Sequence, residues 1–509
     1  MWIRAALIAC AATAPLAAQE AAPPELALPE GNGLSTPDWL SDTLTRPHAD
    51  VATSVDVPDI TVTPLGAVAL DGVGVLPTTI TGLPRGLWGR SETDTLVRLI
   101  QAQPLQGLPA MQAFTQTLVL AELDPPAGQT GAEGRLFLAR LDMLLARGAL
   151  DPAQALIDRA GPANPEVFRR WFDVGLLTDH VARPCAAMEA SPDIAPTFPA
   201  RIFCLARSGD WAAAALSLGT GAALGRITED EADLIARFLD PELFEGEDPL
   251  PPDPAITPLR FQMRVALGER PDTTDLPLAF AHADLSPLAG WRAQVDAAER
   301  LMRAGAIEPT QWLAIATDRV PSASGAVWDR LRALQAFDTA ILAGDLAEVT
   351  RRIGPAANAI AEAHLEVAFA ELYAELLARL PLTGEAARLA RRIALLSPDY
   401  ERAAQRMAPD TAMERLAVDI ARGLPATPPD GADGRSRAIA AAFTAPLPGH
   451  RYGWFIENDR LGEALLRAAL VLSAPEADLD DLTDALVLFR AVGLEDVARR
   501  AALQLLLTG

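Results

Sequence analysis

Apolar residues recur with a helical period along most of the chain. From Ser91 to the C-terminus, short amphipathic stretches stop at a glycine and restart within a few residues, most clearly at Gly148, Gly209, Gly344 and Gly493. Glycine adopts the left-handed conformation that ends a helix, and an acidic residue after it favours the next helix start. Short connections of this kind join antiparallel helices. The pattern predicts an all-α protein, an irregular α-solenoid of antiparallel helix pairs.

Individual helices carry their own signals. Ser91 with Asp94 and Thr228 with Glu231 have the spacing of capping boxes, which satisfy free N–H groups at a helix start. Residues 211–225 hold no charged residue and predict a buried helix. Residues 361–380 predict one helix, with His364 beside its apolar stripe. That stripe consists of Leu365, Phe369, Leu372, Leu376 and Leu380.

One stretch resembles another 157 residues further on. Residues 146–154 are similar to residues 303–311, and Trp171 and Trp328 keep the same spacing. This similarity indicates an ancient duplication or two copies of one helix–turn–helix solution. The 34-residue period of tetratricopeptide repeats is not visible, so we interpret the repeats as irregular and tetratricopeptide-like.

Composition shifts divide the chain further. Residues before 91 are rich in Pro, Gly, Thr and Val and predict an extended arm with minor β structure, anchored by Trp39 and Trp88. Two Pro-rich segments interrupt the helical pattern later. The predicted organisation is a signal peptide (1–18), an arm (19–90), helical unit I (91–239), an acidic linker (240–258), helical unit II (259–421), a second linker (422–437) and a C-terminal helical unit (438–509).

The N-terminus predicts export. One arginine, a short apolar stretch of small residues and Ala17-Ala18 form a secretory signal that is too short to span a membrane. We expect cleavage after Ala18 and a periplasmic or secreted protein. The alternative is a lipoprotein, because residues 7–10 match a lipobox that would acylate Cys10.

Two cysteines remain after cleavage, Cys185 and Cys204, and an even number in an exported chain predicts a disulfide. Helical patterns near 181–190 and 197–208 flank a Pro-rich turn, and each cysteine lies about equally far from its centre. An antiparallel pair would therefore bring them face to face, and the bond would stabilise the fold by about 3 kcal/mol.

Charge and residue usage exclude several functions. The formal net charge is −24, which argues against nucleic acid and against anionic membrane surfaces. All 43 basic residues are arginines, so no lysine is present for a Schiff base or a phosphate-binding Gly-Lys-Ser/Thr loop. No stretch of the mature chain is long and apolar enough to span a bilayer.

No catalytic, cofactor-binding or metal-binding motif is found. The five histidines are dispersed, no Ser has Gly at both −2 and +2, and the carboxylates of the 240–258 linker lack calcium-loop spacing. One unusual cluster stands at a predicted turn between 449 and 455. It is either a contact with a partner or a glycan, or a buried wedge between the last helices. Its members are His450, Arg451, Tyr452, Trp454 and Phe455.

Several of these stretches together resemble a known group. Residues 59–77, 83–100, 201–216, 460–472 and 491–507 look like an uncharacterised family of secreted helical proteins from alphaproteobacteria, sometimes labelled "antifreeze glycopeptide polyprotein". The label implies antifreeze activity, which in such glycopeptides rests on tandem Ala-Ala-Thr units. Here that unit occurs once, at 11–13. The resemblance implies no catalytic residue.

The leading hypothesis is therefore a non-enzymatic scaffold or adaptor that binds an unidentified protein of the cell envelope, because helical solenoids offer extended binding surfaces. The alternative is a peptidoglycan- or glycan-directed enzyme or binder, since superhelical helix-pair domains resemble those of lytic transglycosylases. A lipid-anchored structural protein is a third hypothesis and depends on Cys10.

Overall fold

The computed structural model describes residues 37, 39–40, 69–127, 134–253, 255–444, 446–447 and 449–508. Within these ranges the protein is all-helical, with 25 α-helices, four short 3-10 helices and no β-strand. The predicted signal peptide (1–18), Cys10 and the part of the predicted arm before residue 69, apart from residues 37, 39 and 40, lie outside the described residues.

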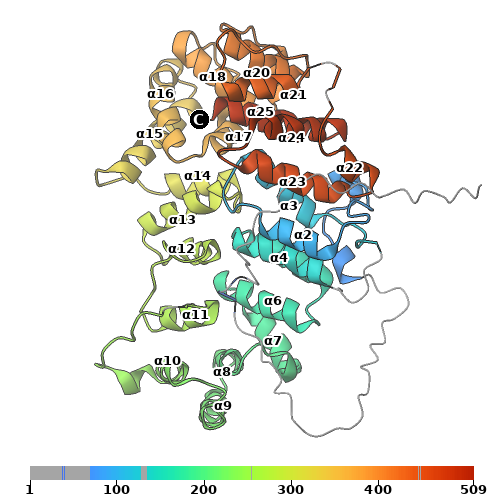
Figure 1. Cartoon of the computed structure of the whole chain (residues 1–509). Helices are drawn as coiled ribbons and strands as arrows, with labels where there is room; N and C mark the ends of the chain where they lie inside the picture. The colour runs from blue at the N-terminus through green and yellow to red at the C-terminus, as the bar shows by residue number, and fades with distance from the viewer. Residues whose placement is uncertain are drawn as a thin grey trace, which may run out of the picture.

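The first part of the chain leads from the middle of the molecule to its lower end (Figure 1). From residue 109 onward, successive helices contact one another along this path. The elements are η1 (Leu70–Gly72), α1 (Thr78–Thr81), α2 (Thr93–Gln101), α3 (Pro109–Leu120), α4 (Arg135–Ala146), α5 (Leu150–Ala160), α6 (Pro165–Leu177), α7 (Ala182–Ala190), η2 (Pro192–Ile194), α8 (Phe198–Arg207) and α9 (Trp211–Ala223).

The second part returns along the other side, drawn in green and yellow in Figure 1. It contacts the first part through α6 with α11 and through α4 with η4. Its elements are α10 (Glu229–Leu239), η3 (Pro241–Phe244), α11 (Pro258–Ala266), η4 (Leu278–Phe280), α12 (Ala281–Asp284), α13 (Trp291–Arg303), α14 (Pro309–Thr317), α15 (Ala326–Leu342) and α16 (Leu346–Glu362).

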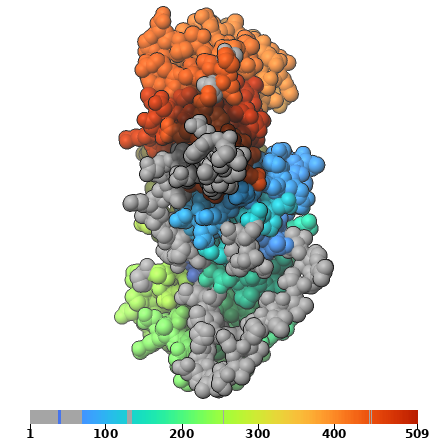
Figure 2. Space-filling model, turned by 45° about the vertical axis from the view of Figure 1, so that its right-hand side comes forward, coloured from blue at the N-terminus to red at the C-terminus, as the bar shows by residue number. Residues whose placement is uncertain are grey.

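The third part forms the upper end and then comes back to the N-terminal helices. Its elements are α17 (Glu366–Leu377), α18 (Gly384–Leu396), α19 (Tyr400–Gln405), α20 (Ala412–Arg422), α21 (Gly434–Ala442), α22 (Gly453–Glu457), α23 (Leu461–Ser473), α24 (Leu479–Ala491) and α25 (Glu495–Leu507). Helix α23 packs against α2 and α3, and α25 packs against α3. The C-terminal segment therefore lies directly against the N-terminal helices, as Figure 2 also shows.

Long-range hydrogen bonds fix this closure of the chain. The side-chain N–H of Gln103 donates to the carbonyl of Leu466 over 3.1 Å. The side-chain oxygen of Gln504 accepts the backbone N–H of Ala110, a free donor in the first turn of α3, over 2.8 Å. Phe114 and Phe489 pack edge to face with ring centroids 5.0 Å apart.

The buried apolar residues form two clusters. One includes residues from the N-terminal half up to Phe280 together with residues from Leu395 to Leu503. The other lies between Leu278 and Leu396. The interruption predicted at 240–258 falls at the connection from α10 to α11, and the one predicted at 422–437 falls at the connection from α20 to α21. Neither connection contains a further α-helix. The first cluster nevertheless continues across both, and the division into three helical units remains a prediction.

The end of the predicted arm is packed into the helices. The Asp71 carboxylate accepts the backbone N–H groups of Gly134 and Phe137 and thereby caps α4 from a distant segment. Fully buried Arg140 donates to the carbonyls of Asp71, Val119 and Ala121. Burial lowers the pKa of Arg140 to about 10, so it stays charged at neutral pH. The expected β structure is limited, in the described part, to one parallel bridge between Leu76 and Ala121.

Trp39 and Trp88 are buried, as expected for anchors of the arm. The Trp39 ring meets Phe280 edge to face at 5.7 Å. Trp88 lies so close to α23 that a Cβ at Gly462 would stand 2.5 Å from its ring.

All four glycine junctions predicted from the sequence separate two helices. Gly148, Gly209, Gly344 and Gly493 have φ between 66° and 89°, the left-handed region that favours glycine. The similar stretches near 146–154 and 303–311 both form a helix, a glycine turn and a helix, α4–α5 and α13–α14. Trp171 and Trp328 lie on the next helices, α6 and α15. The duplication itself remains a prediction.

The continuous helix predicted over 361–380 is wrong. Helix α16 ends at Glu362 and α17 begins at Glu366. His364 lies exposed in the turn with φ 55°, a conformation in which His is enriched among non-glycine residues. The apolar spacing therefore continues across a break, because the buried Leu365 and Phe369 belong to the turn and to the second helix.

One predicted capping box is confirmed and the other is wrong. Thr228 and Glu231 exchange both hydrogen bonds at the start of α10. Ser91 is fully buried and caps nothing, because α2 begins at Thr93 after Glu92, and the Ser91 hydroxyl has no partner among the described residues.

Candidate functional site

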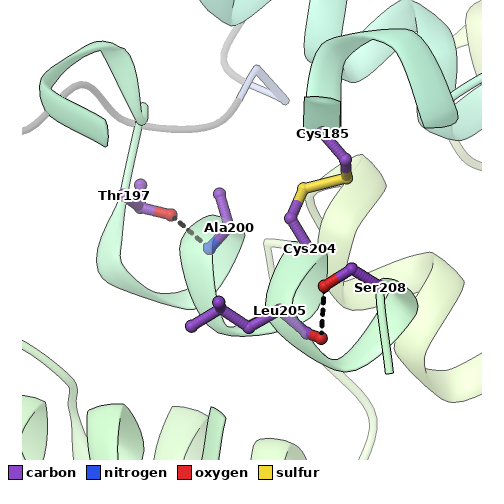
Figure 3. Close-up of a disulfide and its surroundings, with 6 residues drawn as sticks. All are labelled: Cys185, Thr197, Ala200, Cys204, Leu205 and Ser208. Carbon is purple, nitrogen blue, oxygen red and sulfur yellow. Dashed lines mark hydrogen bonds between the residues drawn. A yellow bond between two sulfur atoms is a disulfide. The ribbon is translucent and has the colours of Figure 1, made fainter. Parts of the chain in front are cut away.

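The disulfide is confirmed in the place where the sequence put it. Cys185 on α7 and Cys204 on α8 are joined, with Cα atoms 5.2 Å apart (Figure 3). Thr197 caps the start of α8 by accepting the N–H of Ala200 over 3.1 Å. Among the residues of α7 only Pro184 and Met188 are buried, so the disulfide supplies an attachment that apolar packing of this helix does not.

A surface pocket of about 400 Å³ runs beside this bond, between α7 and α8. Glu189, Arg201 and Arg207 contribute its charged groups, and both cysteines line it. The disulfide therefore stands at the edge of the first apolar cluster: Cys204 is buried within that cluster, Cys185 packs against it, and both line the surface pocket.

The cluster at 449–455 divides between interior and surface. Tyr452 is 0% exposed and Phe455 1% exposed, so these two form the buried wedge that the sequence left open as an alternative. The Trp454 and Phe455 rings meet edge to face at 5.2 Å. A contact role remains a prediction for His450, Arg451 and Trp454, which keep some exposure.

The charges around this cluster are internally balanced. Arg451 pairs with Asp481 and, over 3.0 Å, with Asp484 of α24. Arg460 lies over the Trp454 ring with 5.4 Å between the guanidinium carbon and the ring centroid. Burial lowers the pKa of His450, although Asp484 counteracts this effect, so the imidazole is neutral at pH 7. These contacts join α22 to α23 and α24.

Sequence reasoning missed a pocket of about 550 Å³ that we call the Trp39 pocket. Its lining comes from five separate segments: Pro37 and Trp39, then residues within 100–105, 142–146, 255–256 and 275–278. No local motif connects such distant residues. The single signal in the sequence was Trp39, an aromatic residue in a segment otherwise poor in large side chains.

Helix α9 departs from its prediction. The segment is helical and uncharged as expected, but it is not buried: only Ala214 and Gly221 are. Trp211 is 52% exposed, Leu216 73% and Leu224 65%. We call this surface the α9 face. The absence of charge indicated burial, yet α9 packs against α8 and α10 at the lower end of the molecule, where no further helix of the described residues covers it (Figure 1).

No group of three or more His, Cys, Asp or Glu side chains within the described ranges is placed to hold a metal ion. None of the helices described has the length and apolar character of a membrane span. Two carboxylates of the 240–258 linker pair with arginines: Glu247 with Arg237, and Asp253 with Arg260 and Arg264.

Comparisons with protein-family models, with curated proteins and with solved structures give no match for this chain.

Proposed function

We propose that the protein is an exported, non-enzymatic scaffold, an irregular solenoid of antiparallel helix pairs that binds another protein of the cell envelope. The same proposal counts it among the secreted helical group that its sequence resembles. The α9 face is the observation that carries the binding role. Export is supported by the disulfide, because such bonds persist in oxidising compartments.

The physical argument starts from the cost of exposed apolar surface. Contiguous apolar patches on a protein mark interaction sites, whereas single apolar residues at a surface need no explanation. Terminal helices of a stacked helical array carry a polar outer face when they end in water. Helix α9 lies at such an end and carries Trp211 and Leu216 outward with no charged residue in its length.

The remaining outward positions of α9 also favour a protein partner. Ala212, Ala215, Gly219 and Ala223 are exposed. Small side chains let a second backbone approach closely, while Trp211 and Leu216 supply buried area on contact. A partner helix laid along α9 would continue the stacking that α8 and α10 begin.

A site-specific crosslink tests this proposal. A photoreactive amino acid at position 212, one helical turn before Leu216 on the α9 face, is introduced into the tagged full chain and is expected to capture one discrete envelope protein in the native cells. Leu216→Glu is expected to reduce recovery of that protein at least tenfold, because burying one leucine stabilises a contact by about 1.5–3 kcal/mol.

The matched control is Leu288→Glu. Leu288 is 91% exposed in a turn outside the α9 face, so the same change there tests for a general effect of added charge. Equal recovery from wild type and both variants would reject α9 as the docking surface. Recovery of peptidoglycan fragments instead of a protein would favour the glycan-directed alternative.

The same purification tests export. Mass spectrometry of the mature chain is expected to find Gln19 at the N-terminus without lipid, as cleavage after Ala18 requires. An acylated Cys10 at the N-terminus would instead identify a lipid-anchored protein and reject the free periplasmic or secreted form.

A further inference from the structure

The Trp39 pocket combines an apolar interior with an acidic rim. Trp39, Ile100, Met143, Ile256 and Leu278 line its walls, and each is buried. The volume of about 550 Å³ lies within the range of pockets that hold small ligands. The apolar part of a ligand would leave water when it contacts these walls. Removal of apolar surface from water is the main source of affinity in such sites.

Polar groups on the lining are acidic or neutral. Asp142 is buried, and both of its oxygens are held by Arg170, at 2.5 Å and 2.8 Å, so its charge is already paired. Asp275 is exposed at the rim and has no hydrogen-bond or ion-pair partner among the described residues. It is the one lining carboxylate with its charge available to a ligand.

Among the residues that the structure describes, no arginine lines the pocket. Arg300 contacts the neighbouring loop, where its guanidinium donates to the Thr273 hydroxyl and the Leu276 carbonyl, and these neutral acceptors orient it while leaving its charge in place. A carboxylate-bearing ligand such as a fatty acid would bring its charge next to Asp275, and no cation of the described lining offsets that repulsion. A cationic head would meet a free carboxylate instead.

We propose that the Trp39 pocket binds a small organic amine, with its apolar body between Trp39 and Met143 and its ammonium group at Asp275. This site is independent of the α9 face, from which it differs in residues and in ligand class. Because Pro37 and Trp39 belong to the N-terminal arm and the other walls belong to α2, α4, η4 and the connections beside them, the ligand would bridge the arm and the helical body.

Three probes of one shape test the class of ligand: 4-phenylbutylamine, 4-phenylbutanol and 4-phenylbutanoate. They share a body and differ in the charge of the head. Ligand-observed NMR titration of the full chain is expected to give saturable binding of the amine, with a Kd on the order of 1 mM or below. The alcohol should bind about threefold to tenfold more weakly, and the carboxylate more weakly still.

Two variants locate the site. Asp275→Asn is expected to remove the preference for the amine while leaving binding of the alcohol unchanged. Ala146→Leu adds volume to the wall of the pocket and is expected to weaken both compounds at least tenfold. Asp193→Asn, which changes an exposed carboxylate in η2 outside this pocket, is the matched control and should leave all three affinities as in wild type.

Ionic strength gives a second, mutation-free measurement. Added salt should weaken the amine and not the alcohol, because it screens the exposed Asp275. Equal affinity for amine and alcohol, tighter binding of the carboxylate, or an amine preference that survives Asp275→Asn would each overturn the proposed ligand class. Absence of saturable binding by all three probes would overturn the site.

Discussion

Single residues in this protein hold segments that are far apart in the sequence. Asp71 caps α4, Arg140 donates to three carbonyls from two segments, and His282 on α12 reaches the turn between α4 and α5. Each contact replaces water at a backbone group that helix geometry leaves without a partner. None of the three is recognisable from local sequence, because its partner lies 19 to 134 residues away.

His282 leads to a prediction about pH. Its Nε2 lies 2.5 Å from the Gly148 carbonyl, to which the neutral ring donates. Burial lowers the pKa of His282, with the Gly148 hydrogen bond and Asp151 opposing this effect. As pH falls below about 6.5, the unfolded chain therefore takes up a proton that the folded chain resists, and stability decreases until the pH passes the folded pKa.

Urea unfolding at pH 5, 6, 7 and 8 measures this contribution. Wild type should lose more stability than His282→Gln between pH 7 and 5, by at most about 1.4 kcal/mol per pH unit. Glutamine retains an N–H donor for Gly148 and does not titrate. Parallel pH profiles of the two proteins would show that His282 titrates alike in the folded and the unfolded chain, and would contradict this prediction.

At the scale of helices, the sequence is a good guide to where elements end and a poor guide to which faces are covered. The glycine turns are local, since a left-handed φ is favoured for glycine whatever surrounds it. The break at His364 escaped notice because a polar residue gives a weaker signal than glycine. The exposure of α9 escaped notice because burial depends on the neighbours that the rest of the chain supplies.

The disulfide attaches one helix, α7, to its neighbour α8. The double variant Cys185→Ser/Cys204→Ser should lose about 3 kcal/mol of stability, as expected for closing a loop with a sequence separation of 19. Thermal unfolding of the oxidised protein and of the variant measures the difference. A reducing agent should lower the melting temperature of wild type and leave that of the variant unchanged. An unaltered melting temperature in the variant would mean that α7 is held without the bond.

The whole molecule depends on contact between its first and last helices. The backbone N–H of Gly462 donates to the carbonyl of Leu87, and Arg90 donates in the same way to Asp459. Trp88 lies against Gly462, with no room for a side chain. The N-terminal segment before α2 and the turn before α23 therefore form one packed unit.

Gly462→Ala should destabilise the protein by about 1–3 kcal/mol, because the added methyl group overlaps the fully buried Trp88 ring. Gly219→Ala is the matched control. It lies in the interior of α9 with open space around it, and should stabilise by about 0.5–1 kcal/mol. Denaturant midpoints of the two variants give the comparison. Similar effects of both changes would contradict the close packing of Trp88 on α23.

The candidate sites also differ in how far the local sequence could predict them. Spacing around a Pro-rich turn was enough to pair Cys185 with Cys204, because both cysteines lie on adjacent helices of one short segment. The 449–455 cluster was recognisable by composition, but its composition did not decide that Tyr452 and Phe455 point inward. The Trp39 pocket had no sequence signal beyond one tryptophan, since five segments converge on it.

The sequence by itself determined the helical class, the four glycine turns between helices and the disulfide, because hydrophobic period, glycine conformation and short-range spacing are local properties of the chain. Only the tertiary structure decided that the C-terminal helices return to the N-terminal ones, that no helix of the described residues covers the outer side of α9 and that a pocket forms beside Trp39. These features depend on contacts between residues hundreds of positions apart. Such contacts are set by the shape and burial of whole faces, which a local pattern does not encode.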